Sequence, residues 1–226
     1  MCRFLLVRSK NKIRPEKLLQ DFAFMCKNSH APDGDWQGDG WGIVIKTQSS
    51  KFKVQKWEEY KSLKPVWEEK DKFQEFADTD MFVAHARSAG FPQHKGNIEF
   101  NQPFIQNELC FVFNGMIKGV KIGRTLSGKI GAQKIFSLIL EENKSNSIEN
   151  VLMYVDKLLL ENSEKIIGMN IGVVKENKFY ILCEYEKNSN YFGIRYFQSD
   201  EMTLICSEPI VDYEWTIMKK GEVLSL

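Results

Sequence analysis

Strand-like segments joined by short turns lie at both ends of this chain, and the helical segments lie between them. A first strand is expected over residues 2–8. One helix is expected to begin at residues 14–16, and three more are expected over 65–77, 130–142 and 147–162. Further strands are expected over 41–46, 52–57, 80–88, 166–175, 178–186, 191–198 and 202–206, with a last one near Trp215. The late strands follow one another through short turns, which is typical of antiparallel hairpins and not of strand–helix–strand units. The pattern therefore predicts an α+β layered domain.

The composition is that of an ordinary globular protein. With 226 residues, 43% of them hydrophobic, the chain can build one sizeable core, so we expect a single domain over residues 1–226. The 31 basic and 30 acidic residues nearly cancel, which argues against a nucleic-acid or membrane surface. The apolar run that follows Arg3 ends at Val7, too short for a signal sequence or a membrane span.

The cysteines indicate a reducing compartment. There are five of them, an odd number, scattered along the chain and mostly inside apolar runs. This pattern indicates free thiols of a cytoplasmic protein and not a disulfide framework. We expect neither a metal nor a cofactor.

Cys2 is a candidate nucleophile. Removal of Met1 is favoured by a small second residue and would leave a thiol and a free α-amine on the same residue. Ordinary pKa values are about 8.5 for a thiol and about 8 for an α-amine, so the amine can take the thiol proton and return it to a leaving group near neutral pH. The alternative is that Cys2 is only a small residue at the start of a buried strand.

A glycine-rich segment, Gly38–Gly42, precedes the second strand. It lacks the Gly-Lys-Ser/Thr ending of a phosphate-binding loop, and no helical pattern follows it, so nucleotide binding is not expected. The alternative is a tight turn that needs a positive φ.

The strand over 80–88 carries two polar residues at its end. Period-2 alternation places His85 and Arg87 on one face, together with Met81 and Val83. An arginine fork suits a carboxylate ligand. The alternatives are a structural arginine with a buried partner and a structural histidine.

A third group of residues follows. Asn101 precedes Pro103-Phe104, and the pair Asn114-Gly115 follows an apolar run. Such a pair ordinarily forms a hairpin turn. It can also direct a side-chain amide and a backbone N–H toward one point, as an oxyanion hole requires.

In this order, these motifs resemble the class II glutamine amidotransferases, in particular the stand-alone bacterial and archaeal type. The resemblance rests on Cys2, the Asp39–Gly42 turn, His85–Arg87, Asn101 with Pro103-Phe104, Asn114-Gly115 and the late Ser207-Glu208-Pro209. It implies the N-terminal nucleophile hydrolase fold, a four-layer α/β/β/α sandwich with two antiparallel sheets.

The resemblance also implies roles for individual residues. Cys2 would attack the side-chain amide of glutamine with its own α-amine as base, forming a γ-glutamyl thioester and releasing ammonia. Asn114 and Gly115 would form the oxyanion hole, and Arg87 would hold the substrate α-carboxylate. His85 and Asn101 would belong to the same substrate site, whereas Asp39 and Trp41 would be structural. A separate synthase subunit would receive the ammonia if ammonia is the useful product.

Three positions depart from the family pattern. Gly131 stands where an aspartate usually binds the substrate α-amino group, Gly90 replaces a threonine, and Phe113 replaces a histidine. Losing the charged contact would weaken binding by about 1.5–3 kcal/mol. Two functions follow: an active hydrolase or amidotransferase acting on glutamine or on a γ-glutamyl-like amide without the usual free amine, or a binding or assembly subunit with reduced turnover.

Overall fold

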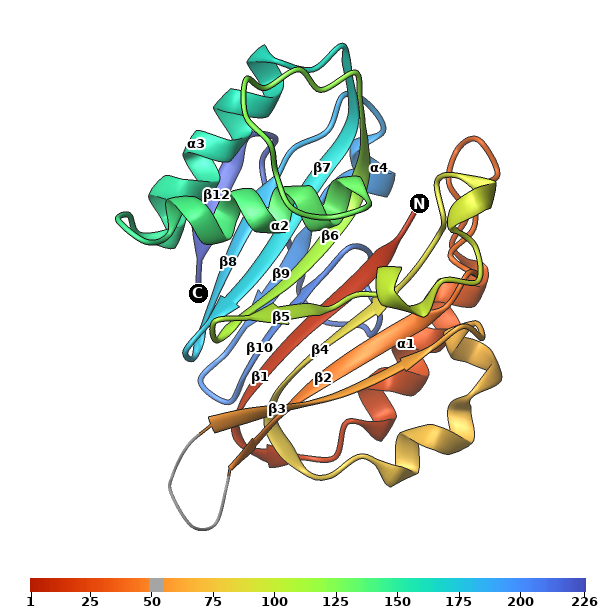
Figure 1. The fold of residues 1–226 in the computed structure, drawn as a ribbon. Helices are drawn as coiled ribbons and strands as arrows, with labels where there is room; N and C mark the ends of the chain where they lie inside the picture. Colours follow the sequence, from red (N-terminus) through yellow and green to blue (C-terminus); the bar gives the residue numbers. More distant parts are fainter. Residues whose placement is uncertain (49–54) are drawn as a thin grey trace. The chain divides into compact units, whose positions relative to one another are not determined.

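The computed structural model describes residues 1–48 and 55–226 (Figure 1). The chain divides into two compact units. The first unit comprises residues 1–103 and 195–217, and the second comprises residues 104–194 and 218–226. Each unit contains one antiparallel sheet and its own helices, which confirms the expected α+β class with two antiparallel sheets.

The first unit is built on a seven-stranded sheet in the order β11-β9-β10-β1-β4-β2-β3. Its strands are β1 (Arg3–Ile13), β2 (Trp41–Gln48), β3 (Gln55–Ser62), β4 (Thr79–Ala86), β9 (Arg195–Gln198), β10 (Met202–Cys206) and β11 (Thr216–Ile217). Strand β1 lies between β10 and β4, so the residue just before it, Cys2, lies near the middle of this unit's sheet. The expected strand over 52–57 lies partly outside the described residues.

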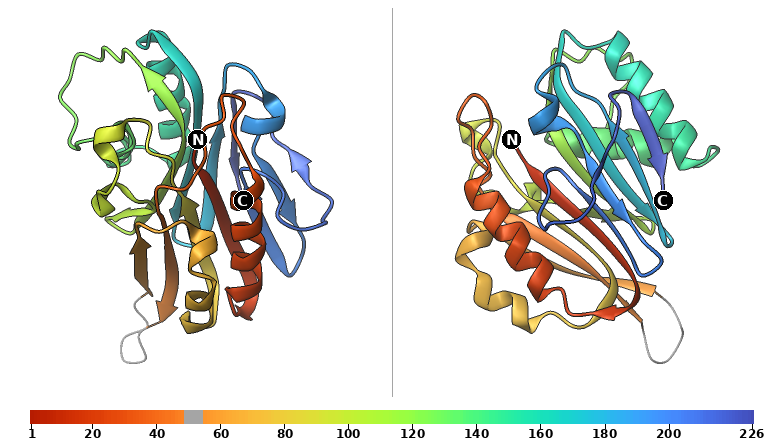
Figure 2. Two further views of the ribbon diagram at one scale, coloured as in Figure 1. Left: turned by 90° about the vertical axis from the view of Figure 1, so that its right-hand side faces the viewer. Right: turned by 180° about the vertical axis from the view of Figure 1, so that it is seen from behind.

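One face of this sheet packs against helix α1 (Glu16–Asn28), as Figure 2 shows. The helix follows Pro15, which suits the start of a helix because its missing N–H has no helical partner there. Phe22 is fully buried against Leu5 and Val7 of β1. The core thus packs against β1, and Cys2 immediately precedes this strand.

The prediction of a helix over 65–77 is wrong in the type of helix. The segment forms two short 3₁₀ helices, η1 (Val66–Glu68) and η2 (Lys70–Glu75), interrupted at Glu69, whose φ of −123° is not helical. Its few apolar residues are too widely spaced to give an α-helix a continuous buried stripe. Phe73 and Phe76 nevertheless point inward as expected, and both are buried.

The second unit has a five-stranded sheet in the order β12-β8-β7-β6-β5. Its elements are β5 (Phe104–Gln106), β6 (Leu109–Lys118), α2 (Gly131–Glu142), α3 (Ile148–Glu161), β7 (Lys165–Lys175), β8 (Lys178–Cys183), α4 (Ser189–Phe192) and β12 (Glu222–Ser225). Helices α2 and α3 cover one face of this sheet (Figure 1). The helices expected over 130–142 and 147–162 are confirmed.

Two late expectations need correction. The strand expected over 178–186 ends at Cys183, and the strand expected over 191–198 begins only at Arg195. The backbone of Asn188 is left-handed and is followed by the single turn of α4, so this part of the chain cannot stay extended.

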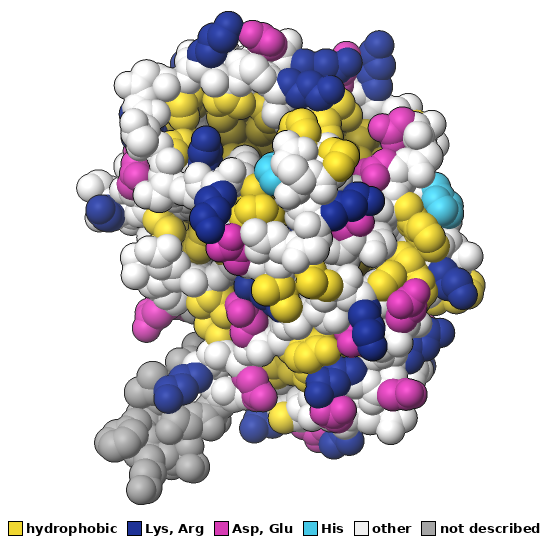
Figure 3. All heavy atoms as spheres, turned by 45° about the vertical axis from the view of Figure 1, so that its right-hand side comes forward, with side chains coloured by type: hydrophobic (Ala, Val, Ile, Leu, Met, Phe, Trp, Pro, Cys, Tyr) yellow, Lys and Arg dark blue, Asp and Glu magenta, His cyan; other side chains and the backbone are white. Residues whose placement is uncertain are grey.

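The surface and the thiols agree with the composition. On the face drawn in Figure 3, basic and acidic side chains are interspersed and neither sign forms a continuous patch. All five cysteines are free; Cys2 is half-buried, and the buried ones are Cys26, Cys110, Cys183 and Cys206. In the described part of the chain, no helix is both long and apolar enough to cross a membrane.

Candidate active site

The register of β1 against β4 determines the surroundings of Cys2. Arg3 lies opposite Ala86, so Cys2 lies beside the residues that follow β4. Its Sγ accepts a hydrogen bond from the Ser88 N–H at 3.4 Å and donates to the Ser88 carbonyl at 3.6 Å. The thiol is therefore held at a defined position by the backbone of one residue.

The Cys2 thiol is not a preformed thiolate. Burial raises its pKa above the ordinary value, although the nearby α-ammonium, the Ser88 N–H and Arg87 act in the opposite direction. A thiol with a raised pKa is protonated at neutral pH and needs a base before it can attack a carbonyl carbon. This favours a mechanism that uses an adjacent amine.

The α-ammonium of Met1 is bound by Asp35. It donates to Oδ2 of Asp35, and the Ser88 hydroxyl donates to the same oxygen at 2.5 Å. Burial opposes ionisation of Asp35, but these hydrogen bonds outweigh it, and the pKa of the carboxyl lies below its ordinary value. Asp35 is therefore a carboxylate at neutral pH. No motif or periodicity singles out Asp35 in the sequence.

The late Ser207-Glu208 segment is tied to the start of β1. The fully buried Arg3 guanidinium donates to the Ser29 hydroxyl at 2.8 and 3.0 Å and to Glu208 at 3.0 Å, and Ser207 Oγ accepts the Phe4 N–H at 3.0 Å. These bonds fix the backbone on the C-terminal side of Cys2. Local periodicity could not reveal them because Arg3 and Glu208 are 205 residues apart.

Arg87 orders the segment that follows it. Its guanidinium donates to the Asn97 carbonyl at 3.2 Å, to the His94 carbonyl at 2.6 Å and to the Asn101 side-chain oxygen at 3.1 Å. The Asn101 amide nitrogen donates in turn to the Ser62 carbonyl at 2.7 Å. Asn101 is fully buried, so its observed contacts are those of a residue that positions Arg87. The substrate contacts expected of both residues stay predictions.

His85 lies on β4, opposite Phe4 of β1, and is fully buried. It therefore belongs to the same sheet region as Cys2. Its expected role in substrate binding also stays a prediction.

The glycine-rich segment is a tight turn, as its alternative interpretation expected. Gly40 has φ +118°, and a Cβ there would lie 2.5 Å from the Asn101 side-chain nitrogen. Asp39 accepts the Ala89 N–H at 2.8 Å and pairs with Lys95 at 3.0 Å. Trp41 is fully buried in the core.

In the second unit, Asn114 and Gly115 lie within β6, so a hairpin turn at this pair is wrong. Asn114 is fully buried, and neither atom of its side-chain amide has a hydrogen-bond partner among the residues that the structure describes. Its cross-strand neighbour on the same face, Asn170, is also fully buried. The Asn170 amide donates to the Phe192 carbonyl at 2.6 Å and accepts the Glu184 N–H at 3.1 Å. Of these two asparagines, only Asn170 has an evident structural role.

Gly115 is required by the packing of the two strands. A Cβ at this position would lie 1.9 Å from the Gly168 carbonyl oxygen of β7. No side chain fits such a gap, so glycine at this position is explained by the close approach of β6 and β7.

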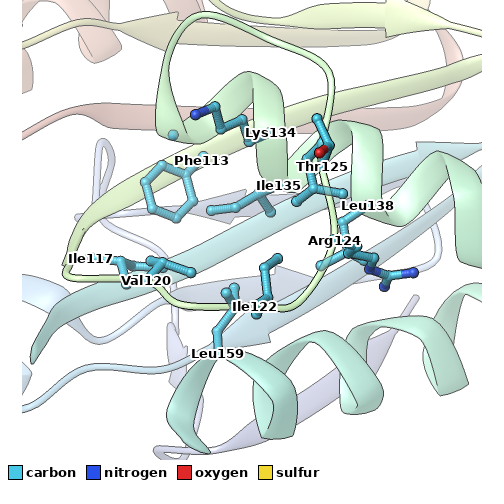
Figure 4. A pocket seen from close by; sticks show the side chains of 12 residues that line it. Phe113, Ile117, Val120, Ile122, Arg124, Thr125, Lys134, Ile135, Leu138 and Leu159 are labelled. Atoms are coloured by element: carbon cyan, nitrogen blue, oxygen red, sulfur yellow. The ribbon is translucent and has the colours of Figure 1, made fainter. Parts of the chain in front are cut away.

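Gly131 borders an apolar cavity of about 300 Å³ on the helical side of β6. Phe113, Ile122 and Ile135 surround this space in Figure 4. Because side chains alternate along a strand, the cavity and the Asn114 amide lie on opposite faces of the sheet. A Cβ at Gly131 would meet nothing within 4 Å. The position therefore has room for a side chain, but the cavity that it borders is on the other face of the sheet from the Asn114 amide.

The expected site residues are thus divided between the units. Cys2, His85, Arg87 and Asn101 lie in the first unit, whereas Asn114 and Gly115 lie in the second. Among the described residues, no group of histidine, cysteine, aspartate or glutamate side chains is arranged to hold a metal ion.

No protein-family model and no curated protein matches the sequence. Solved structures do. A glutamine aminotransferase class-II domain protein from Silicibacter pomeroyi is 14% identical, with a TM-score of 0.62 over 99% of this chain and 94% of that one. A predicted glutamine amidotransferase from Pseudomonas aeruginosa is 13% identical, with a TM-score of 0.57 over 99% of this chain and 96% of that one.

A third similar structure is a larger enzyme. The glutamine phosphoribosylpyrophosphate amidotransferase of Bacillus subtilis is 12% identical, with a TM-score of 0.59 over 91% of this chain. The chain corresponds to 42% of that enzyme's length. At these identities the likeness shows the fold. The chain therefore has the N-terminal nucleophile hydrolase fold that these class II glutamine amidotransferase structures share.

Proposed function

We propose that this protein is an amide hydrolase or amidotransferase that uses Cys2, after removal of Met1, to cleave the side-chain amide of glutamine or of a γ-glutamyl-like amide. The thiol sulfur bonds to the amide carbon while its proton moves to the Cys2 α-amine. Collapse of the tetrahedral intermediate breaks the C–N bond, and the α-amine returns the proton to the leaving ammonia or amine. Water then hydrolyses the thioester to the carboxylate and restores the thiol.

The observation that carries this proposal is the amide of Asn114, which is buried and finds no hydrogen-bond partner within residues 1–48 and 55–226. Leaving a buried amide without partners costs about 1–3 kcal/mol, and native proteins rarely keep such groups without a reason. An oxyanion hole is such a reason, because its donor must stay available for the charge that develops on the substrate oxygen. The family resemblance assigns the second donor to the Gly115 N–H, the residue next to Asn114 on β6.

The surroundings of Cys2 support the same chemistry. Its raised pKa calls for a base, and an α-amine on the same residue would supply one without any further side chain. In this mechanism Arg87 holds the substrate α-carboxylate. A guanidinium has five N–H donors, and its three bonds to the 94–101 segment leave donors for that contact. His85 and Asn101 support the site, and a separate synthase subunit is the candidate acceptor of ammonia.

A second function is favoured by one specific observation. Gly131 provides no charge where the family pattern has an aspartate, so a member that binds or assembles without turnover would tolerate the same sequence. The experiment that separates the two functions measures glutamate release from glutamine and from a panel of γ-glutamyl amides.

The controls for that assay are Cys2→Ala and Cys26→Ala. The hydrolase proposal expects release by the wild type and by Cys26→Ala, and none by Cys2→Ala. Absence of release by the wild type with every amide, in protein shown by mass to lack Met1, would favour the binding subunit.

A further inference from the structure

We propose that the apolar cavity beside the 119–130 segment of the second unit binds a small carboxylate with an aliphatic chain. The volume of this cavity is about 300 Å³. Its ligand would be a fatty acid of medium chain length, with the chain inside the cavity and the carboxylate at Lys134. This is a second site, separate from the candidate active site, and the inference does not depend on the proposed function.

The cavity is too large to be a packing gap. Protein interiors contain few voids larger than a water molecule, and an apolar cavity of about 150 Å³ already takes up a molecule such as benzene. At roughly 30 Å³ for each water-sized group, the space that Phe113, Ile122 and Ile135 surround has room for about ten methylene groups. An aliphatic chain that enters this space leaves water, which favours binding.

The 119–130 segment is held in place beside the cavity. The Arg124 guanidinium donates to the Glu142 carboxylate at 2.8 Å. The Lys121 N–H donates to the Asn162 carbonyl at 2.8 Å. These bonds tie the segment to the end of α2 and to the residue that follows α3, so the cavity is formed before any ligand enters.

The cavity has a polar end and an apolar end. In Figure 4, Lys134 and Thr125 lie at one end of the space, beside α2. Ile117, Val120 and Leu159 lie at the opposite end. This division matches a ligand that carries one polar group on an apolar chain.

The charge at the polar end is positive. No acidic side chain of the described residues lines the cavity. Helix α2 has no acidic residue in its first turn, so the partial positive charge at its N-terminus is not offset there. Gly131, which borders the cavity, and Lys134 are three residues apart on α2 and therefore share one face of the helix.

Lys134 is the cation available for a carboxylate. Arg124 also lines the cavity, but it is paired with Glu142 at 2.8 Å. Within residues 1–48 and 55–226, Lys134 forms no ion pair. An anionic ligand would therefore offset a charge that the described residues leave without a counter-ion.

Calorimetry of the full chain with octanoate tests the site. Octanoate should bind more tightly than butyrate, by up to about fourfold for each added methylene group. An excess of glutamine should not displace it, because the cavity and the Asn114 amide lie on opposite faces of the sheet.

Lys134→Glu tests the charge, and Lys157→Glu is the matched control. Both reverse one exposed lysine on a helix of the second unit, but Lys157 lies on α3 and does not line the cavity. We expect Lys134→Glu to weaken octanoate binding about fivefold to tenfold and to leave the binding of uncharged octan-1-ol unchanged. Lys157→Glu should change neither affinity.

Gly131→Leu tests the location. A Cβ at this position meets no atom within 4 Å, so the leucine side chain has room to occupy part of the cavity. It should weaken octanoate and octan-1-ol alike, in protein whose thermal unfolding shows that it is folded.

Three results would overturn the inference. They are no octanoate binding at millimolar concentration, displacement of octanoate by glutamine, and equal effects of Lys134→Glu and Lys157→Glu. None of them bears on the hydrolysis of amides by Cys2, so the failure of this inference and the failure of the proposed function are distinguishable.

Discussion

Asn114 and Asn170 occupy paired positions on β6 and β7, and the difference between them can be measured. We predict that Asn114→Ala lowers kcat about 10²–10³-fold, the usual effect of removing one oxyanion-hole donor. The substitution breaks no side-chain hydrogen bond among the described residues, so the free energy of unfolding should not fall for that reason. Asn170→Ala should instead lower the free energy of unfolding by about 1–3 kcal/mol, because it leaves the Glu184 N–H and the Phe192 carbonyl without their partner.

Kinetics and urea denaturation of both variants provide the check. A stability loss at Asn114 as large as that at Asn170, with kcat intact, would show that Asn114 is only structural.

Arg87 has two roles in this account. It holds the 94–101 segment in place, and it is expected to bind the substrate α-carboxylate. Lysine offers a point charge in place of a fork, so Arg87→Lys should raise KM for glutamine. It should also lower Tm, because one ammonium cannot replace the three bonds to the 94–101 segment. Steady-state kinetics and thermal unfolding measure the two effects separately. A lowered Tm with unchanged KM would leave Arg87 as a structural residue and remove it from the substrate site.

Two glycines of the second unit differ in whether their secondary-structure element can accept a side chain at that position. Gly115→Ala would place a methyl group against the β7 backbone, so we expect a loss of about 1–3 kcal/mol of stability. Gly131→Ala meets no atom and begins a helix, so it should stabilise α2 by about 0.5–1 kcal/mol. Chemical denaturation of the two variants tests the pair. If Gly115→Ala raised the free energy of unfolding as much as Gly131→Ala does, the β6 and β7 backbones could move apart at that position at no cost in stability.

Helix α3 carries a pH-dependent contribution to stability. Burial raises the pKa of Asp156 to about 6, and Glu184 adds to the shift while Lys220 opposes it. The folded state therefore binds a proton more tightly than the unfolded chain, and the free energy of unfolding should fall as the pH rises from about 4 through about 6.

Asp156→Asn should remove that fall and stabilise the protein at neutral pH. Because Asp156 is half-buried, solvent screening leaves a gain of roughly 1 kcal/mol. Glu161→Gln, an exposed change on the same helix, is the control. Thermal unfolding across this pH range provides the measurement, and an unchanged slope in Asp156→Asn would contradict the assignment.

The elements that the sequence predicted well are those with dense apolar patterns. Val151, Leu152, Val155 and Leu159 give α3 a continuous buried stripe, and Ser147 caps its start. The segment over 66–75 has too few apolar residues to specify an α-helix, and β5 and β12 are too short for alternation to indicate a strand. In these segments, contacts with the rest of the unit determine the conformation.

For the whole molecule, contacts between distant parts of the chain were beyond local prediction. Residues 195–217 return to the first unit, where β10 pairs with β1. The family resemblance could be found from the order of Cys2, Arg87 and Asn114 along the chain, because each motif is local, and the roles of these residues stay predictions. The bonds that join Arg3 to Glu208 and Asp35 to Ser88 could not, because neither pair has a periodic or motif signal.

The central claim is that Cys2 is the nucleophile and that its α-amine is free. Intact-protein and peptide mass spectrometry after treatment with a glutamine-like electrophile tests both parts together. The account predicts that Met1 is absent, that one label is incorporated, and that the label lies on Cys2 and blocks turnover. Retention of Met1 in active protein, or labelling of Cys26, Cys110, Cys183 or Cys206 while Cys2 is spared, would contradict it.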